Sequence, residues 1–145
     1  MSRSLVVGDI HGRAAALEEV LEKCNFDRVR DTLISLGDIV DGGRETKRCF
    51  EILETIPNKI ICLGNHEEWC LNWFLMGIEY PLWVHQGGYA TMESYGFDRT
   101  NVPDSHKCYS DYNQEAYKYP PKTKLFPCRI ERNNICFAGG DKFLY

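Results

Sequence analysis

Three short phrases in the first half of the chain combine glycine with aspartate, histidine or asparagine. They read GDIHG at residues 8–12, GDIVDGG at 37–43 and GNHE at 64–67. Each follows a short apolar run (LVV, LISL and IICL), which is typical of a buried parallel strand. Because the carboxyl ends of parallel strands meet at one edge of a sheet, where α/β proteins bind ligands, we expect the three phrases to converge.

The side chains in these phrases are of the types that hold a hydrolytic metal centre. Asp9 and His11 are separated by one residue, so in extended backbone they point the same way and can hold a single divalent ion. Asp38 follows the second apolar run, and its two carboxylate oxygens can bridge a pair of ions. Asn65 offers a neutral oxygen ligand from the third phrase. We therefore predict a metal site formed by these four residues.

The third phrase also supplies a histidine for proton transfer. We predict that His66 donates a proton and that Asp41 holds its imidazole in the correct tautomer. Taken singly, such residues have ordinary explanations, since Gly-Asp is common in turns and an aspartate often caps a helix. Three such phrases in order, each after an apolar run, favour a catalytic site.

Length and composition are those of one soluble globular domain. The 145 residues, 43% hydrophobic and 26% charged, fit a single domain over 1–145. No apolar stretch approaches a membrane span and the N-terminus lacks a signal-peptide layout, so we expect no membrane partner and a cytoplasmic location. The net charge of -4 argues against a nucleic-acid partner. The seven cysteines include no CxxC pair, which favours reduced, structural thiols over a zinc site.

The three phrases alternate with amphipathic segments, which is the pattern of βαβ units in an α/β fold. We expect buried strands at 5–7, 32–36 and 59–63, helices at 13–24, 45–55, 67–76 and 106–117, a partly helical segment at 80–96, and a hairpin-like pair of strands at 129–132 and 135–138.

The phrases resemble the GDxHG, GDxxDRG and GNHE signatures of the calcineurin-like metallophosphoesterases, and most of all their phosphoprotein phosphatase branch. Trp83, Thr91 and the Gly-Gly pair between them are similar to a segment of bacterial and phage members. The resemblance covers residues 4–96. It implies a layered αββα sandwich, here in a truncated version that keeps the N-terminal βαβαβ half.

By this resemblance, Asp9, His11 and Asp38 hold the first metal, and Asp38 and Asn65 contribute to a second. A metal-bound hydroxide attacks phosphorus, and His66, paired with its aspartate, protonates the leaving oxygen. Manganese is the expected ion, and the mixed oxygen and nitrogen ligands also permit iron or zinc.

Three features depart from the family pattern. Gly42 stands where the family has a phosphate-binding arginine, and Arg44 either takes this role or is an ordinary exposed residue at a helix start. Asn65 and His85 are further candidates for contact with the substrate phosphate. Ala138 stands where the family has a metal-binding histidine, and the relatives' Gly-His-Thr turn would fall beyond the last residue of this sequence. We therefore expect a complete first metal site and an under-ligated second one.

The predicted function is a metal-dependent phosphoesterase, most similar to serine/threonine protein phosphatases, that acts on a phosphorylated protein or a small phosphoester. One alternative is a truncated or degenerate member that binds metal or phosphate without turnover. Another is a dinucleoside tetraphosphate hydrolase. A nucleotide-binding Rossmann module would need a GxGxxG turn, which the sequence lacks. Half a sheet would also leave an apolar edge and face uncovered, which favours self-association.

Overall fold

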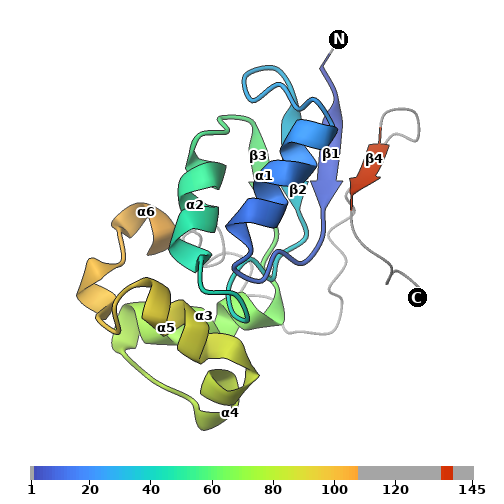
Figure 1. Cartoon of the computed structure of the whole chain (residues 1–145). Helices are drawn as coiled ribbons and strands as arrows, with labels where there is room; N and C mark the ends of the chain where they lie inside the picture. The colour runs from blue at the N-terminus through green and yellow to red at the C-terminus, as the bar shows by residue number, and fades with distance from the viewer. Residues whose placement is uncertain (1, 108–134, 139–145) are drawn as a thin grey trace, which may run out of the picture.

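The computed structural model describes residues 2–107 and 135–138. Their strands form one parallel sheet in the order β3-β2-β1-β4 (Figure 1). The strands are β1 (Ser4–Val7), β2 (Thr32–Ser35), β3 (Lys59–Ile61) and β4 (Ile135–Ala138). The last residue of β1, Val7, is paired with the last residues of β2 and β4, so these strands end level with one another.

Helices α1 (Ala14–Lys23) and α2 (Thr46–Glu54) connect β1 to β2 and β2 to β3. Because parallel crossovers are right-handed and both step in the same direction across the sheet, the two helices cover the same face. They pack side by side there (Figure 1). The following helices are α3 (Asn65–Met76), α4 (Pro81–Trp83), a π-helical turn (Val84–Gly88), α5 (Tyr89–Ser94), a 3-10 turn (Arg99–Asn101) and α6 (Asp104–Lys107). The predicted α/β class is confirmed.

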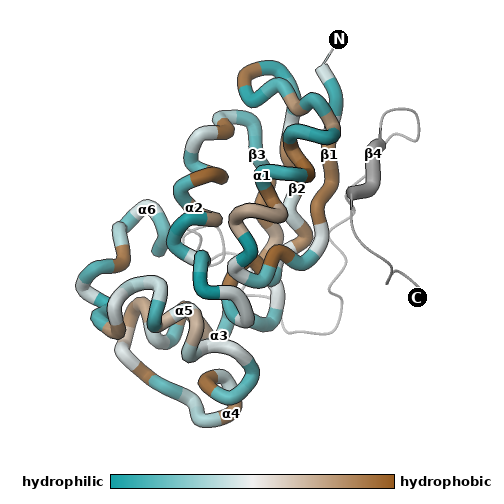
Figure 2. Tube along the Cα trace, viewed as in Figure 1, coloured by the Kyte–Doolittle hydropathy of each residue, from teal (hydrophilic) through white to brown (hydrophobic). Residues whose placement is uncertain are grey.

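The core forms where these helices meet the sheet. Leu17 and Leu21 lie four residues apart on one face of α1. They are buried in one cluster with Leu53 of α2 and Leu33 of β2. Figure 2 shows the apolar stretches of β1 and β2 beneath α1. Burial of each such side chain contributes about 1.5–3 kcal/mol, which fixes the strands and therefore the loops at their ends.

The third strand was predicted to be buried, but it is partly exposed. β3 lies at the edge of the sheet, where Ile60 is 52% exposed and Cys62 is also exposed. The apolar run could not distinguish an edge strand from a central one, because both have the same composition. The apolar run at 60–63 also predicts a buried Cys62, which the structure contradicts, whereas Cys49 and Cys70 are buried.

Two boundaries also depart from the predictions. Helix α3 begins at Asn65, two residues earlier than expected. Gly64 is the N-cap residue, and the Glu67 side chain accepts a hydrogen bond from the Gly64 N–H. The strand at 135–138 is present, and it pairs in parallel with β1; its predicted hairpin partner at 129–132 lies outside the described residues. The predicted helix at 106–117 extends beyond them too. In the part of the chain that is described, no helix is long and apolar enough to cross a bilayer.

Candidate metal centre

Main-chain hydrogen bonds join the loop after β1 to the loop after β2. The N–H groups of Ile10 and His11 donate to the carbonyl oxygen of Asp38 at 3.0 and 2.8 Å. Gly12 N–H donates to the carbonyl of Ile39 at 2.7 Å. His11 and Asp38 both adopt left-handed backbone, with φ of 46° and 51°. Such conformations are uncommon for residues other than glycine. They persist only where the surrounding structure enforces them, and they are frequent at ligand-binding sites.

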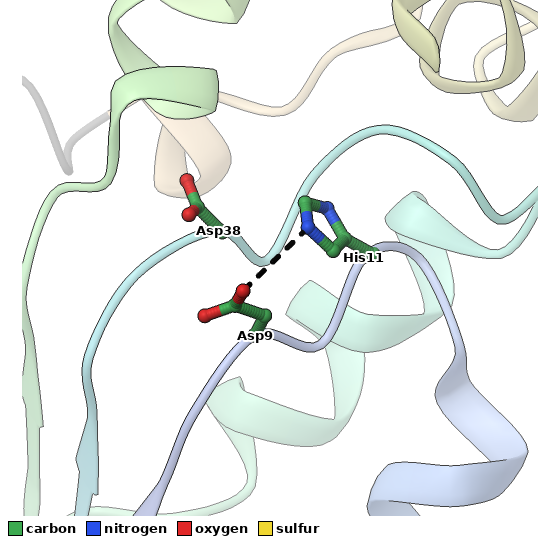
Figure 3. Close-up of side chains that lie close together, drawn as sticks. All are labelled: Asp9, His11 and Asp38. Atoms are coloured by element: carbon green, nitrogen blue, oxygen red, sulfur yellow. Dashed lines mark ion pairs between the residues drawn. The ribbon is translucent and has the colours of Figure 1, made fainter. Parts of the chain in front are cut away.

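The joined loops bring Asp9, His11 and Asp38 together (Figure 3). Each side chain offers one ligand atom, and the three atoms all lie within 4.8 Å of one another. His11 Nε2 is 3.9 Å from Asp9 Oδ2. Asp9 is exposed and the other two residues are half-buried, so the cluster is open to solvent.

This cluster fits a divalent ion. Two ligands that are each about 2.1 Å from one ion lie at most about 4.2 Å apart, so a small adjustment of the side chains brings all three into range. The orientation of His11 is already suitable. Its Nδ1 is 3.0 Å from the carbonyl oxygen of Val40, and because a carbonyl only accepts, Nδ1 carries the proton. This leaves Nε2 as the ring nitrogen for coordination in the neutral imidazole, which is the usual arrangement of a metal-binding histidine.

A buried carboxylate fixes the Asp38 loop against the start of α3. Glu67 accepts four main-chain hydrogen bonds of 2.6–3.2 Å, from the N–H groups of Asp38, Ile39, Val40 and Gly64. Burial raises the pKa of Glu67, and these four donors oppose that rise by stabilising the carboxylate. One side chain therefore joins the second and third phrases.

His66 and Asp41 form a hydrogen-bonded pair beside the cluster. His66 Nδ1 lies 2.8 Å from Asp41 Oδ2, and the His66 and His11 rings meet edge to face with centroids 4.9 Å apart. The main-chain N–H of His66 donates to Asp38 Oδ1 at 3.2 Å. With Asp41 ionised, Nδ1 is the donor of the pair, and Nε2 is the ring nitrogen that remains for proton transfer.

Two further donors hold the Asp41 carboxylate. Trp83 Nε1 donates to Oδ2 at 2.8 Å, and the hydroxyl of Thr91 donates to Oδ1 at 2.8 Å. Burial raises the pKa of Asp41, and the hydrogen bonds from His66, Thr91 and Trp83 oppose this shift. The buried carboxylate thus has a donor for each oxygen.

The other predicted site residues are less constrained. Asn65 is the exposed first residue of α3. Arg44 is 78% exposed, with its Nε 3.0 Å from Glu93 Oε2. His85 is exposed within the π-helical turn Val84–Gly88. The roles of these three residues toward a second metal or a phosphate stay predictions.

Sequence reasoning gave no role to Glu67, Trp83 or Thr91. A signal for Glu67 was present, since an acidic residue three positions after a helix N-cap often accepts the N-cap N–H. Trp83 and Thr91 were noted only for the resemblance of their segment to bacterial and phage members, which indicated no contact with Asp41. Their partner, Asp41, lies 42 and 50 residues away along the chain, and only the folded structure brings them together.

A parallel α/β sheet with an Asp-His-Asp cluster and an adjoining His-Asp pair at the carboxyl ends of its strands has the arrangement of a metal-dependent hydrolase. Residues 2–142 match the family model of the calcineurin-like phosphoesterases. The chain belongs to this family, and the resemblance seen in its sequence is confirmed.

Three relatives define the extent of the match. The chain is 36% identical over 83 residues to serine/threonine-protein phosphatase 1 of Salmonella typhimurium, which covers 57% of this chain and 38% of that protein. It is 33% identical over 66 residues to the symmetrical bis(5'-nucleosyl)-tetraphosphatase of Coxiella burnetii, over 46% of this chain and 23% of that one. A metallophosphoesterase structure from Sphaerobacter thermophilus has a TM-score of 0.53 and 27% identity, covering 75% of this chain and 39% of the other. The chain therefore spans at most 39% of any of these three relatives.

Proposed function

We propose that this protein is a metal-dependent phosphomonoesterase of the serine/threonine phosphatase type. The observation that carries the proposal is the meeting of two groups, since the His66 ring of the His-Asp pair lies 4.9 Å from the His11 ring of the open Asp-His-Asp cluster. The Asp-His-Asp cluster is suited to bind a cation that carries the phosphate, and the His-Asp pair is suited to donate a proton. Membership of the calcineurin-like phosphoesterase family supports the same chemistry.

In this proposal Asp9, His11 and Asp38 hold a divalent cation. When bound, the cation supplies Lewis acidity, which lowers the pKa of coordinated water and neutralises phosphoryl charge. The two carboxylates balance the charge of the ion, and the contact of His11 Nδ1 with the Val40 carbonyl leaves Nε2 as the ring nitrogen for coordination. The exposure of Asp9 leaves the centre accessible to a phosphoester on a large substrate.

His66 is the proposed general acid. In its protonated form, Nδ1–H is held by Asp41 and Nε2–H is directed to the leaving oxygen. The ionised Asp41 stabilises this imidazolium, as the aspartate of a catalytic triad does. The hydrogen bond from the His66 main chain to Asp38 Oδ1 keeps the acid at a fixed position relative to the cation site.

We propose manganese as the natural ion, with iron or zinc as alternatives, because oxygen and imidazole donors suit all three. A second ion would take ligands from Asp38 and Asn65, and it would be held weakly because position 138 is alanine. We also propose a reducing, cytoplasmic setting, because Cys49 and Cys70 are buried as thiols rather than joined in disulfides. Burial raises the pKa of Cys49 to about 12 and that of Cys70 well above its ordinary value, which keeps both thiols protonated and inert.

Phosphoserine or phosphothreonine in a protein is the substrate class that we propose. The match to the Salmonella phosphatase covers more of this chain, 57%, than the match to the Coxiella tetraphosphatase, 46%. A dinucleoside tetraphosphate remains the second candidate because of the latter match. Comparing turnover of a phosphoserine peptide with that of diadenosine tetraphosphate separates the two.

The proposal is tested by hydrolysis of p-nitrophenyl phosphate with added Mn²⁺. Asp38→Asn should abolish turnover and weaken Mn²⁺ binding in calorimetry, whereas Glu68→Gln, which changes an exposed carboxylate on α3, should leave both unchanged. Equal and negligible rates for the unaltered chain and Asp38→Asn would contradict the enzyme and support a degenerate family member that binds metal without turnover.

A further inference from the structure

The segment from α4 to α5 contacts the His-Asp pair on the side of Asp41. We propose that Trp83 and Thr91 are positioning residues that orient Asp41 and, through it, the His66 imidazole for protonation of the leaving group. This inference rests on the proposed function.

The geometry leaves the Asp41 carboxylate little freedom. Its Oδ2 accepts from both His66 Nδ1 and Trp83 Nε1 at 2.8 Å, and its Oδ1 accepts from Thr91 at 2.8 Å. Rotation about the carboxylate bond would therefore break at least one of these hydrogen bonds. The three donors come from α3, α4 and α5, so the orientation of the carboxylate depends on the packing of all three helices.

Thr91 also controls the main chain at Asp41. The Asp41 N–H donates to Thr91 Oγ1 at 2.9 Å, so one hydroxyl accepts from the main chain and donates to the side chain of the same residue. Asp41 has φ of 71°, which is uncommon for a non-glycine residue and needs such support. Thr91 and Asp41 are both fully buried, so water cannot replace either bond.

The glycines between Trp83 and Thr91 explain how the segment approaches so closely. A Cβ on Gly88 would collide with the Trp83 indole, and a Cβ on Gly87 would collide with the main chain of Gly42, next to Asp41. The Gly87 carbonyl also accepts a hydrogen bond from Gly42 N–H at 3.2 Å. The Gly-Gly pair is therefore needed for Trp83 and Thr91 to come within hydrogen-bond distance of the Asp41 carboxylate.

A positioning role can be distinguished from a purely structural one by the leaving group. Proton donation matters most for a leaving group of high pKa, such as a phenol of pKa about 10, and least for nitrophenols, which leave as stable anions. A variant that misorients His66 should therefore lose more activity on phenyl phosphate than on 2,4-dinitrophenyl phosphate. A variant that merely loosens the fold should lose the same fraction on both.

Thr91→Val removes the donor with almost no change in shape, and Thr91→Ser restores it. Thr46→Val is the matched control, because Thr46 is also fully buried and its hydroxyl is hydrogen-bonded at 3.3 Å to that of Thr91 rather than to the Asp41 carboxylate. Trp83→Phe tests the second donor against Trp73→Phe, a neighbouring buried indole with a ring centroid 6.2 Å away.

The proposal predicts that Thr91→Val and Trp83→Phe lower kcat on phenyl phosphate about tenfold more than on 2,4-dinitrophenyl phosphate. Thr91→Ser, Thr46→Val and Trp73→Phe should show no such difference, and Mn²⁺ affinity should be unchanged in all five. Losses in Thr91→Val that are equal across substrates, or that match those of Thr46→Val, would overturn the proposal.

An unaltered chain that hydrolyses neither ester would instead disprove the proposed function. The positioning role can then be tested by NMR of the His66 ring N–H that faces Asp41. A shift of this resonance in Thr91→Val but not in Thr46→Val would support the role. An unchanged resonance in Thr91→Val would refute it.

Discussion

The carboxylate of Glu67 lies 2.7 Å from the main-chain nitrogen of Asp38, so a residue of α3 fixes the loop that carries a proposed metal ligand. Glu67→Gln replaces one carboxylate oxygen by an NH₂ group that faces main-chain donors. Since a buried N–H without a partner costs about 1–3 kcal/mol, we expect the free energy of unfolding to fall by about 2–4 kcal/mol. Mn²⁺ affinity should fall about tenfold, because the Asp38 loop loses its support.

Urea unfolding and calorimetric titration with Mn²⁺ measure the two effects of Glu67→Gln. Glu68→Gln is the control, since Glu68 is the exposed neighbour on the same helix turn and should change neither quantity measurably. Wild-type stability in Glu67→Gln would show that the main-chain donors find other partners and that Glu67 does not fix the loop.

A second prediction concerns the close approach of Gly64 to the same aspartate. The backbone of Gly64 has φ of -85°, which any residue adopts, so Gly64→Ala introduces no backbone strain. Its Cβ would, however, collide with Oδ1 and with the main-chain nitrogen of Asp38, so both the side chain and its loop must shift. We expect Asp38 to rotate out of the cluster, and Mn²⁺ affinity measured by calorimetry to fall at least about tenfold. An unchanged affinity with unchanged circular dichroism would mean that Asp38 is not a ligand.

Local patterns were sufficient to predict the elements that position the cluster. The apolar runs and helical spacing located both ends of β1, β2, α1 and α2 to within one residue, because each is a regular element with one buried face. The meeting of Asp9, His11 and Asp38 was predictable because each lies just after a strand, and the parallel topology brings these strand ends to one edge of the sheet.

The contacts that complete the site could not be predicted in this way. Trp83 and Thr91 reach Asp41 through tertiary packing, and neither residue type at that spacing specifies a hydrogen bond to a distant carboxylate. The exposure of β3 likewise depends on which strand occupies the edge, which is a property of the whole sheet.

A third prediction uses the register of β4. Ala138 pairs with Val7, the last residue of β1, which lies two residues before Asp9. A histidine at 138 would add an imidazole donor at this edge. We expect Ala138→His to raise the Mn²⁺ stoichiometry from one to two in calorimetry, whereas Ala138→Leu, which adds bulk without a donor, should leave it at one. Two tight sites in the unaltered chain would refute the weak second site.

A fourth prediction concerns pH and the N-terminus. Hydrogen bonds from the Arg3 side chain, at 3.1 and 2.7 Å, lower the pKa of Asp31 to about 2. Because this pKa lies below the unfolded value of about 3.9, the pair stabilises the fold above about pH 4, and the contribution is lost as the pH falls toward 2. Asp31→Asn should therefore reduce stability at neutral pH, and its difference from the unaltered chain should shrink below about pH 4.

Urea unfolding across this pH range measures the Asp31 effect. Asp104→Asn is the control, because Asp104 is exposed and its ion pair with Lys107 is a surface contact of little energetic value. A constant difference between Asp31→Asn and the unaltered chain from neutral pH to about pH 2 would show that the Arg3 pair is not responsible.

The last prediction concerns Arg44, which lies two residues after Gly42, the position of the phosphate-binding arginine in the family. Arg44 is exposed and ion-paired with Glu93, an arrangement that a substrate phosphate could replace without desolvating the guanidinium deeply. If Arg44 binds the phosphate in the ground state and the transition state alike, Arg44→Ala should raise KM about tenfold and leave kcat unchanged. Arg48→Ala is the matched control, since Arg48 is an exposed arginine of α2 paired with Glu51, and its KM should stay at the wild-type value. Equal KM values for Arg44→Ala and the unaltered chain would assign Arg44 to the surface alone, because an arginine that contacts the phosphate cannot be removed without weakening substrate binding.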